Sequence, residues 1–556
     1  MSEATTAAQA PEATNGFKSF WDYEGKGKGI RSWIFSTDHK RIGIMYMWSM
    51  IAFFAVGATL GGIMRLELFT LGKTLVEAQT YNAIFTLHGI IMIFLFIIPG
   101  IPAAFGNFFL PLQIGAADVA FPRLNLLSYW LYLLGGTMAI ASLFLGGGPI
   151  DTGWTFYVPY SIRTTTDVIF PLSAAFILGL SSILTGINFI TTTHRLRAKG
   201  MSFFKMTLFT WSLYATAWIQ IIGTPIIGLT ILLVIVERAF QVGIFDPSLG
   251  GDPILFQHLF WIYSHPAVYI MILPAMGVAS DIIPTFARKT IFGYKAVAFS
   301  SIAIAFVGTL VWGHHMFTSG MSDESVWIYS FLTFIVAIPS AIKVFNWVAT
   351  LYKGSIKVTT PFIFVMAFIF LFSIGGLTGL IVGAIATDLH VHDTYFVVGH
   401  FHYVMFGGAG FVFFAAVHYW FPKMFGRMYN ERRAKIAAVI LVIGFNMLYF
   451  TMFILGYKGM PRRYYDSLPE FLTLHQVATV GSWILLGGLL FMGINLLLAF
   501  KQKRRQMPNS PWGGMTLEWQ TTSPPPLENF HEEPIVKYGP YEYDKFKEVM
   551  GYEYKD

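Results

Sequence analysis

FVVGHFHYVMFGGAGFVFFAAVHYWF, residues 396–421, is the stretch that best indicates the fold of this sequence. It contains no Asp, Glu, Lys or Arg, and it exceeds the roughly 20 residues that a helix needs to cross the hydrocarbon core of a bilayer. The composition agrees, because 55% of the 556 residues are hydrophobic and only 12% are charged, which is too apolar for a soluble domain of this size. The sequence therefore predicts an integral membrane protein.

Similar apolar runs recur along the chain and predict an all-α integral membrane protein with about twelve transmembrane helices, because in lipid each span must satisfy its own backbone hydrogen bonds. The twelve runs are 42–64, 82–105, 125–147, 170–191, 207–235, 257–283, 293–314, 326–349, 361–385, 396–421, 436–457 and 477–500.

Lysine and arginine predict the orientation of these spans. The connections after even-numbered spans carry about twice as many basic residues as those after odd-numbered spans, which by the positive-inside rule places both termini in the cytoplasm. A basic N-terminal arm agrees, with Lys26, Lys28, Arg31, Lys40 and Arg41 before the first span. We expect no cleavable signal peptide. The net charge of +7 reflects this bias, so it indicates no nucleic-acid partner.

The chain divides into three parts by composition. We expect residues 1–41 to form a cytoplasmic N-terminal arm, 42–502 a twelve-helix membrane domain, and 503–556 a cytoplasmic tail. Residues 1–15 are rich in Ala, Thr and Glu, a composition typical of disorder.

Cysteine is absent, which excludes disulfides, iron–sulfur clusters, thiolate copper sites and covalent haem attachment through a C-x-x-C-H motif within this chain. Any metal must therefore be held by histidines and carboxylates.

Histidines inside apolar spans indicate where the chemistry occurs, because a buried imidazole needs a partner or a metal. A lone histidine such as His258 or His418 is more often hydrogen-bonded core than a ligand. His400 and His402 are more informative, since residues two apart lie about 200° apart around a helix and point to opposite sides. One helix is thus expected to serve two metal centres.

Two further clusters complete the pattern. His314 and His315 are adjacent, so they converge on one metal only with help from another element. His265 and Tyr269 are four apart in the sixth span, hence on one helix face, and supply a third nitrogen beside a phenol. Three imidazoles without a thiolate suit copper or iron. His88, alone in the second span, is weak evidence by itself but can face His402 as a second axial ligand.

Seven strings together resemble subunit I of the haem–copper terminal oxidases in both order and spacing, over roughly residues 36–525. They are DHKRIGIMY (38–46), HGIIMIF (88–94), SHPAVY (264–269), VWGHHMF (311–317), IPSAIKVFNW (338–347), HDTYFVVGHFHYVM (392–405) and GMPRRY (459–464). The resemblance is to aa3-type (A-type) cytochrome c oxidase, in the Tyr-Ser branch that lacks a glutamate in the sixth helix. It implies four-electron reduction of O2 to water with proton pumping, in a multi-pass protein of a bacterial inner (cytoplasmic) membrane.

By this resemblance the histidines divide into three ligand sets. They are His88 and His402 for low-spin haem a, His400 for high-spin haem a3, and His265, His314 and His315 for Cu-B. Tyr269 matches the tyrosine that is covalently joined to a copper-ligating histidine in this family. Cleaving the O–O bond without releasing peroxide needs four electrons at once, and a phenol can supply one electron and one proton.

Other matches lie near the haem edges. Arg462 and Arg463 lie on the outer side against the positive-inside trend, which is explained if they pair with haem propionates. The remaining matches are Trp154 at a propionate, Arg65 near the formyl group of the low-spin haem, and His392 with Asp393 as ligands of a Mg2+. Two ligands are an incomplete site without a neighbouring subunit.

Lys343 lies within the eighth span, where a buried charge costs about 2.5–3.5 kcal/mol or more and is usually functional. With Ser340 and Ser280 it resembles the K pathway, which delivers protons toward Tyr269.

Asp118, with Asn107 and Asn125, resembles the start of the D pathway, although Asp118 taken alone would be a solvated loop carboxylate. Many relatives have a glutamate at the top of this pathway, where the present sequence has Ala267. Tyr263, one helical turn earlier, and the adjacent Ser264 are expected to fill that role. A tyrosine is better suited to relaying protons than to storing one in ionised form.

Electrons are expected from cytochrome c through a Cu-A centre on subunit II, because this chain has no cysteine to bind Cu-A itself. Quinol-oxidising relatives carry a polar Arg/Asp/His/Gln set on their first two helices, and Val56, Leu60, Thr80 and Ala83 cannot replace it. The resemblance also implies subunit III and small subunits. Whether the cytochrome c is fused to a subunit or joined in a supercomplex stays open, as do the haem side chains and the pumping stoichiometry.

A secondary transporter would share the length, the topology and the buried charges, but it would not need six imidazoles arranged for two haems. Nitric-oxide reductases and cbb3-type oxidases are nearer alternatives, and the positions of Tyr269 and Lys343 argue against both.

Overall fold

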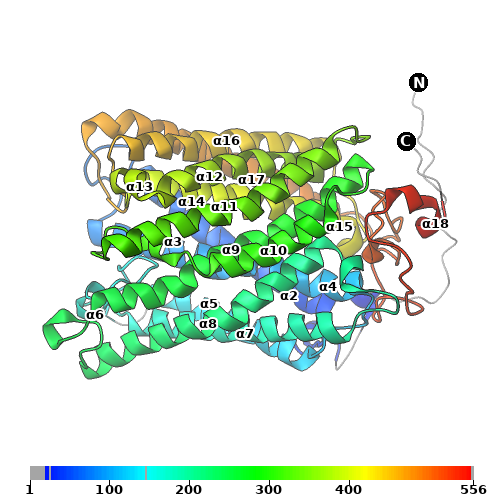
Figure 1. Cartoon of the computed structure of the whole chain (residues 1–556), viewed down its shortest axis with the longest axis horizontal. Coiled ribbons are helices and arrows are strands. Elements are labelled where there is room, and N and C mark those ends of the chain that lie inside the picture. Colours follow the sequence, from blue (N-terminus) through cyan, green and yellow to red (C-terminus); the bar gives the residue numbers. More distant parts are fainter. Residues whose placement is uncertain (1–18, 24–26, 145–146, 553–556) are drawn as a thin grey trace.

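The computed structural model describes residues 19–23, 27–144 and 147–552. In this part of the chain there are only helices, turns and loops, and the long helices lie side by side along one axis (Figure 1). The predicted all-α membrane fold is confirmed. Segment 1–15, expected to be disordered, lies outside the described residues.

Eleven helices of the described chain are long and apolar enough to cross a membrane. Two of them are composites: α3 (Ala78–Ile90), η2 (Ile91–Ile97), η3 (Gly100–Gly106) and α4 (Asn107–Ile114) form one, and α14 (Tyr395–Val404), η7 (Met405–Gly410) and α15 (Phe411–Phe425) form the other. The others are α2 (His39–Glu67), α5 (Pro122–Ala141), α7 (Ile169–Arg195), α8 (Leu208–Phe240), α9 (Pro253–Ala287), α11 (Asp323–Leu351), α12 (Thr360–Gly383), α16 (Glu431–Tyr457) and α17 (Leu472–Phe500), the last extended by η8 (Pro469–Phe471).

The remaining helices and turns are shorter and lie between these spans, before the first or after the last. They are α1 (Arg31–Ile34), α6 (Tyr160–Arg163), α10 (Tyr294–Gly308), α13 (Ile385–Val391), α18 (Phe546–Met550) and the 3-10 turns η1 (Phe20–Asp22), η4 (Phe203–Lys205), η5 (Pro247–Leu249), η6 (Trp312–Met316), η9 (Leu517–Trp519) and η10 (Tyr543–Lys545).

The seventh predicted span, 293–314, differs from the prediction. Its helix α10 is only 15 residues long, and after it the chain forms the 3-10 turn η6. Ending the helix early allows the chain to turn His314 and His315 toward α9. Hydrophobicity alone could not reveal this, because apolar residues continue at Leu310, Val311 and Trp312 beyond the end of the helix.

The centre of the bundle is formed by α9 and the composite helix α14–α15. In each of these two helices, 89% of the most apolar stretch is buried inside the protein. The corresponding share in the other long helices is 22–67%. These two spans carry His265, His400 and His402, so the candidate ligands lie on the most enclosed helices.

Three segments, η2, η3 and η7, are π-helical. The first begins just after His88 and the last just after His402. Wide turns of this kind are rare and often accompany functional sites. Both candidate ligands of the low-spin haem thus precede a widened turn.

Small residues allow close helix packing, as is typical of membrane bundles. A Cβ at Gly444 of α16 would lie 2.4 Å from the backbone nitrogen of Leu485 of α17, and one at Gly481 would lie 2.5 Å from that of Leu448. The two helices therefore contact each other backbone to backbone.

The C-terminal tail packs against one end of the bundle, beside α18 in Figure 1. Trp512 and Trp519 are buried there. Lys423 of α15 donates to the carbonyl oxygens of Thr521 (2.7 Å) and Thr522 (3.2 Å). The N–H of Phe20 donates to the Pro525 carbonyl at 3.1 Å. The first and last described segments thus lie at the same end of the bundle.

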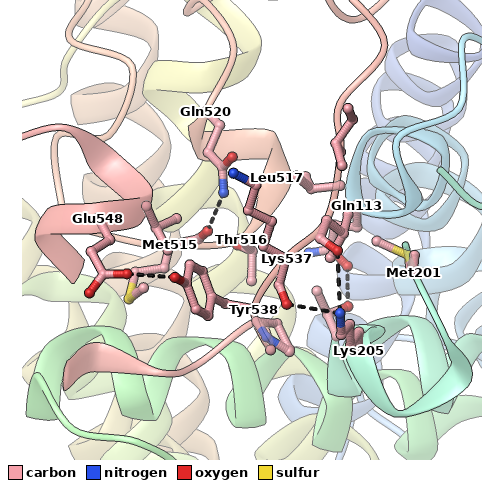
Figure 2. Close-up of a pocket in the computed structure, with 16 residues that line it drawn as sticks. Gln113, Met201, Lys205, Met515, Thr516, Leu517, Gln520, Lys537, Tyr538 and Glu548 are labelled. Carbon is pink, nitrogen blue, oxygen red and sulfur yellow. Dashed lines mark hydrogen bonds between the residues drawn. The ribbon is translucent and has the colours of Figure 1, made fainter. Parts of the chain in front are cut away.

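A cavity of about 160 Å³ lies between the tail and the ends of α4 and α8 (Figure 2). Gln113, in its wall, donates to the carboxyl oxygens of Asp281 and Glu518, at 3.0 Å each. Asp281 lies sixteen positions beyond His265 on α9, about 24 Å along the helix. The cavity therefore belongs to the docking of the tail and is distant from the histidines.

Candidate metal centre

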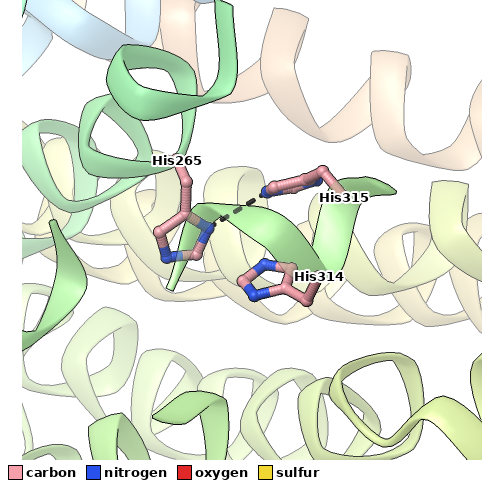
Figure 3. Close-up of side chains that lie close together, drawn as sticks. All are labelled: His265, His314 and His315. Atoms are coloured by element: carbon pink, nitrogen blue, oxygen red, sulfur yellow. Dashed lines mark hydrogen bonds between the residues drawn. The ribbon is translucent and has the colours of Figure 1, made fainter. Parts of the chain in front are cut away.

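Three histidines converge from two elements, His265 from α9 and His314 with His315 from η6 (Figure 3). One nitrogen from each ring lies within 4.8 Å of the others. His265 Nδ1 lies 3.0 Å from His315 Nε2, and the ring centres of His265 and His314 are 4.4 Å apart. This is a nitrogen-only group with the size of a single-metal site.

Neighbouring side chains orient the rings. His314 Nδ1 lies 3.0 Å from Thr333 Oγ1 of α11. The ring of His315 stacks on Trp261 of α9, with centres 3.8 Å apart and planes at 5°. The indole of Trp261 in turn donates to the Tyr157 hydroxyl at 2.6 Å. Sequence reasoning missed Trp261, and nothing distinguishes it from the other aromatic residues until the fold stacks it on His315.

Tyr269 lies beside this cluster, as its spacing from His265 predicts. The two ring centres are 4.9 Å apart in an edge-to-face arrangement. A Cβ at Gly308, the last residue of α10, would lie 2.4 Å from the phenol ring. Glycine at this position therefore lets α10 approach the ring closely.

His400 and His402 contact different neighbours, as residues two apart on a helix should. His400 Nδ1 lies 3.2 Å from Thr378 Oγ1 of α12. The ring of His402 stacks on Tyr449 of α16, with centres 4.2 Å apart, and its Nδ1 lies 2.9 Å from the Val398 carbonyl oxygen.

His88 on α3 faces α2. Its Nδ1 lies 2.8 Å from the Gly57 carbonyl oxygen, and a Cβ at Gly61 would lie 3.0 Å from its ring. In His88 and His402 a carbonyl engages Nδ1, which fixes the proton on that nitrogen and leaves Nε2 as a lone-pair donor. Both rings are thus prepared as neutral ligands.

Trp154 packs against Gly89, the neighbour of His88, and against Trp261, which stacks on His315. A Cβ at Gly89 would lie 3.0 Å from the Trp154 side chain, and the ring centres of Trp154 and Trp261 are 6.0 Å apart. Trp154 therefore lies between the two groups of candidate ligands.

Arg462 and Arg463, in the loop between α16 and α17, have polar contacts within this chain. Arg462 forms an ion pair with Asp393, and Arg463 reaches Thr155 Oγ1 at 3.4 Å. His392 Nδ1 lies 2.7 Å from the Asp388 carboxylate, whereas its Nε2 is 4.0 Å from Asp393. His392 therefore contacts Asp388, which sequence reasoning missed, more closely than its sequence neighbour Asp393.

Arg65 is held by α17. Its guanidinium donates to the His475 carbonyl at 2.9 Å and lies 3.3 Å from Thr479 Oγ1. His475 was not among the predicted residues, because a lone histidine in a span gives little signal.

Lys343 is buried, and its partners lie on α10. Its ammonium donates to Ser301 Oγ at 2.7 Å and to the Val297 carbonyl at 3.1 Å. Ser340 bonds the Val336 carbonyl of its own helix. Ser280 bonds Met276 and accepts from the Trp347 indole at 2.9 Å. Ser301 is thus the direct partner that sequence reasoning missed.

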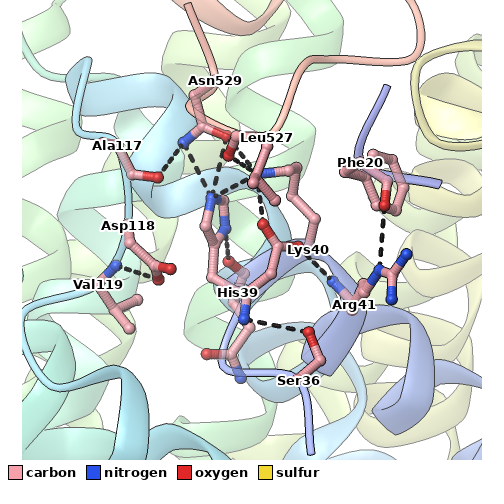
Figure 4. Close-up of polar contacts among 12 residues, drawn as sticks. Phe20, Ser36, His39, Lys40, Arg41, Ala117, Asp118, Val119, Leu527 and Asn529 are labelled. Carbon is pink, nitrogen blue, oxygen red and sulfur yellow. Dashed lines mark hydrogen bonds and ion pairs between the residues drawn. The ribbon is translucent and has the colours of Figure 1, made fainter. Parts of the chain in front are cut away.

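Asp118 lies in the connection between α4 and α5, beside the start of α2 (Figure 4). It accepts from the Val119 N–H at 2.6 Å. Burial, with the nearby charge of Asp38, raises the pKa of Asp118 from its ordinary value of 3.8 to about 7. The carboxyl is therefore able to exchange a proton near neutral pH, unlike a solvated loop carboxylate.

Buried polar groups extend from Asp118 into the bundle. Among the described residues, both amide atoms of Asn125 and the oxygens of Asn107 and Gln220 have no hydrogen-bond partner. A cavity of about 40 Å³ reaches Gln220, and its lining includes Ser181.

Tyr263 is 3% exposed, and its ring contacts Gly223 of α8, where a Cβ would be 3.3 Å away. The buried Ser264 hydroxyl has no hydrogen-bond partner within the described chain. Gly223 and the cavity-lining Gln220, both missed by sequence reasoning, lie on the same helix α8.

Comparisons with known proteins agree with this geometry. A sequence model of the family described as Cytochrome C and Quinol oxidase polypeptide I matches residues 41–484. Cytochrome c oxidase subunit 1 of Synechocystis sp. is 44% identical over 518 residues, with 93% of each chain covered. The subunit 1 of Bacillus sp. (strain PS3) is 40% identical, over 92% of this chain and 84% of the relative.

A solved structure supports the fold. A cryo-EM structure of a haem–copper terminal oxidase dimer aligns with a TM-score of 0.74 at 20% identity, covering 92% of this chain and 98% of that one. At this identity the likeness concerns the fold alone.

Proposed function

This chain belongs to the Cytochrome C and Quinol oxidase polypeptide I family, as a catalytic subunit of a haem–copper terminal oxidase, and we propose that it reduces O2 to water at a centre of haem a3 and Cu-B. Electrons come from cytochrome c, and the reaction is coupled to proton pumping. Membership of this family excludes the secondary transporter, and relatives named cytochrome c oxidase favour this activity over nitric-oxide reduction.

The histidine triad is the observation that carries the proposal. His265, His314 and His315 offer three nitrogens within 4.8 Å of one another, and among the described residues His265 Nε2 has no hydrogen-bond partner. Nitrogen donors without thiolate fit copper. Copper and haem, when bound, supply the electrons and the O2-binding position.

The remaining histidines fit two haems. We assign His400 to haem a3 and His88 with His402 to low-spin haem a, because two helices present neutral imidazoles with Nδ1 engaged. The glycines against these rings, Gly61 and Gly379, keep the adjacent space free of side chains. Tyr269, beside the copper ligands, would supply one electron and one proton from its phenol for cleavage of the O–O bond.

The residues of the two proton routes would hold and move protons. Lys343, with Ser301, Ser340 and Ser280, would serve Tyr269. Asp118 would take up protons and pass them through Asn107 and Asn125 toward Tyr263 and Ser264. Buried polar atoms without protein partners along this second route support it, because such atoms are normally satisfied by water.

The outer loops would complete the cofactor sites. Arg462, Arg463 and Trp154 would contact haem propionates, and Arg65 the formyl group of haem a. His392 and Asp393 would bind Mg2+, with Asp388 orienting the imidazole.

Because the relatives are named subunit 1, other subunits are implied. The eleven long apolar helices agree with a location in a membrane. We propose a bacterial inner membrane, both termini in the cytoplasm, and the division into 1–41, 42–502 and 503–556. Subunit II would hold Cu-A, since this chain has no cysteine.

A reduced-minus-oxidised absorption spectrum of the purified complex tests the proposal. We expect the bands of two haems, and binding of carbon monoxide to one of them only. A protein without haem absorbance, or with both haems binding carbon monoxide, would contradict it.

A further inference from the structure

Asn529 in the C-terminal tail connects three separate parts of the chain (Figure 4). It is fully buried. Its amide nitrogen donates to the carbonyl oxygens of Ala116 (2.7 Å) and Ala117 (3.2 Å), and lies 2.9 Å from His39 Nε2. Its amide oxygen accepts from the Lys40 ammonium at 2.7 Å. The tail is thus bonded to the start of α2 and to the residues just before Asp118.

Lys40 is held from three sides. Besides Asn529, it contacts the Asp38 carboxylate at 2.9 Å and donates to the Leu527 carbonyl at 2.8 Å. Asp38 and Lys40 are both buried, and both act on Asp118 by their charges. A side chain that fixes Lys40 therefore also fixes the electrostatic surroundings of Asp118.

The residue type at position 529 matters. Its φ of 70° lies in the left-handed region, which asparagine adopts more readily than most residues other than glycine. Only an amide side chain can both donate to two carbonyls and accept from an ammonium at one site. Leucine or alanine could supply none of these bonds.

We propose that Asn529 is a positioning residue for proton uptake at Asp118, through its bonds to Lys40 and to the connection that carries Asp118. The inference rests on the proposed role of Asp118 in the proton route. The tail thereby takes part in proton uptake, in addition to covering the end of the bundle.

The expected effects follow from the charges around Asp118. Burial and Asp38 raise the pKa of Asp118, whereas Lys40 lowers it. Removing the Asn529 side chain loosens the tail over Asp118 and admits water, which lowers this pKa. A carboxylate at position 529 neutralises the effect of Lys40, which raises it. His39 also faces Asn529 through Nε2, and its Nδ1 lies 2.7 Å from the Asn107 carbonyl oxygen.

The test is the pH profile of turnover in the intact purified oxidase. We expect the alkaline limb to move down by about one pH unit in Asn529→Ala and up by a similar amount in Asn529→Asp, with haem and copper contents unchanged. Thr522→Ala is the matched control, because within the described chain that tail hydroxyl bonds only the Pro524 carbonyl. Its profile should equal that of the wild type.

A tail anchor without electrostatic effect would lower the unfolding temperature of both Asn529 variants and leave both profiles in place, which would overturn the inference. Asp118→Asn separates this failure from failure of the proton route. If Asp118→Asn slows turnover while the Asn529 variants keep the wild-type profile, only the inference fails. If Asp118→Asn has wild-type turnover, the route itself is wrong.

Discussion

Lys343→Met tests the proposed K route quantitatively. Lys343 is 1% exposed, and its amine has two hydrogen bonds, to Ser301 and to the Val297 carbonyl. Methionine keeps the length of the side chain and removes a charge whose burial in a membrane costs about 2.5–3.5 kcal/mol. We therefore expect the unfolding temperature and both haems to be retained.

Turnover should respond differently. Positioned proton donors and acceptors contribute roughly 10²–10⁴-fold to a rate. Reduction of haem a3, followed by stopped-flow absorbance after mixing with reductant, should slow by at least ~100-fold in Lys343→Met, because this reduction needs a proton at the same site.

Ser301→Ala removes one of the two bonds of the amine. A hydrogen bond to a charged group is worth about 1.5–3 kcal/mol, so the slowing should lie between about tenfold and a hundredfold. Ser300→Ala is the matched control, since among the described residues that hydroxyl bonds only the Ala296 carbonyl of its own helix. Unchanged reduction kinetics in Lys343→Met would show that the lysine is a structural cation and would refute the reasoning.

Three further outcomes are expected. Tyr263→Phe should weaken proton release from reconstituted vesicles at normal haem and copper contents, and Ala267→Glu in that background should restore it; wild-type pumping by the single variant would contradict the relay. Trp261→Ala should lower copper retention during dialysis against a chelator, because His315 loses its stacking partner; equal retention would remove that role. Glu237→Ala should lower the unfolding temperature, since three backbone N–H groups at 2.8–3.1 Å lose their acceptor, at about 1–3 kcal/mol each if left unsatisfied; an unchanged temperature would show that water replaces the carboxylate.

The membrane spans were predictable because bilayer thickness imposes a length and a composition on every span. The predicted runs overlap the observed helices, and the exception is instructive. Run 293–314 is again apolar at Leu310, Val311 and Trp312, yet α10 ends at Gly308. What ends it is the packing around Tyr269 and the turn at His314, and these are tertiary effects that hydrophobicity does not encode.

The candidate ligands were also predictable, because imidazoles are expensive in an apolar span and their spacing restricts which of them share a metal. Their supporting residues were not. Ser301, Trp261 and Asn529 belong to residue types that occur throughout the chain. Each acquires its role only when the fold brings it to a partner on another element. In Asn529 that partner is about 490 positions away in sequence.

The copper content of purified His314→Ala tests most directly the claim that three histidines form the copper site. His314 offers one of the three nitrogens, and its removal leaves only two. Metal analysis should give full iron for both haems and loss of the copper assigned to this chain, with no oxygen reduction. Full copper occupancy in His314→Ala would contradict the assignment of the centre.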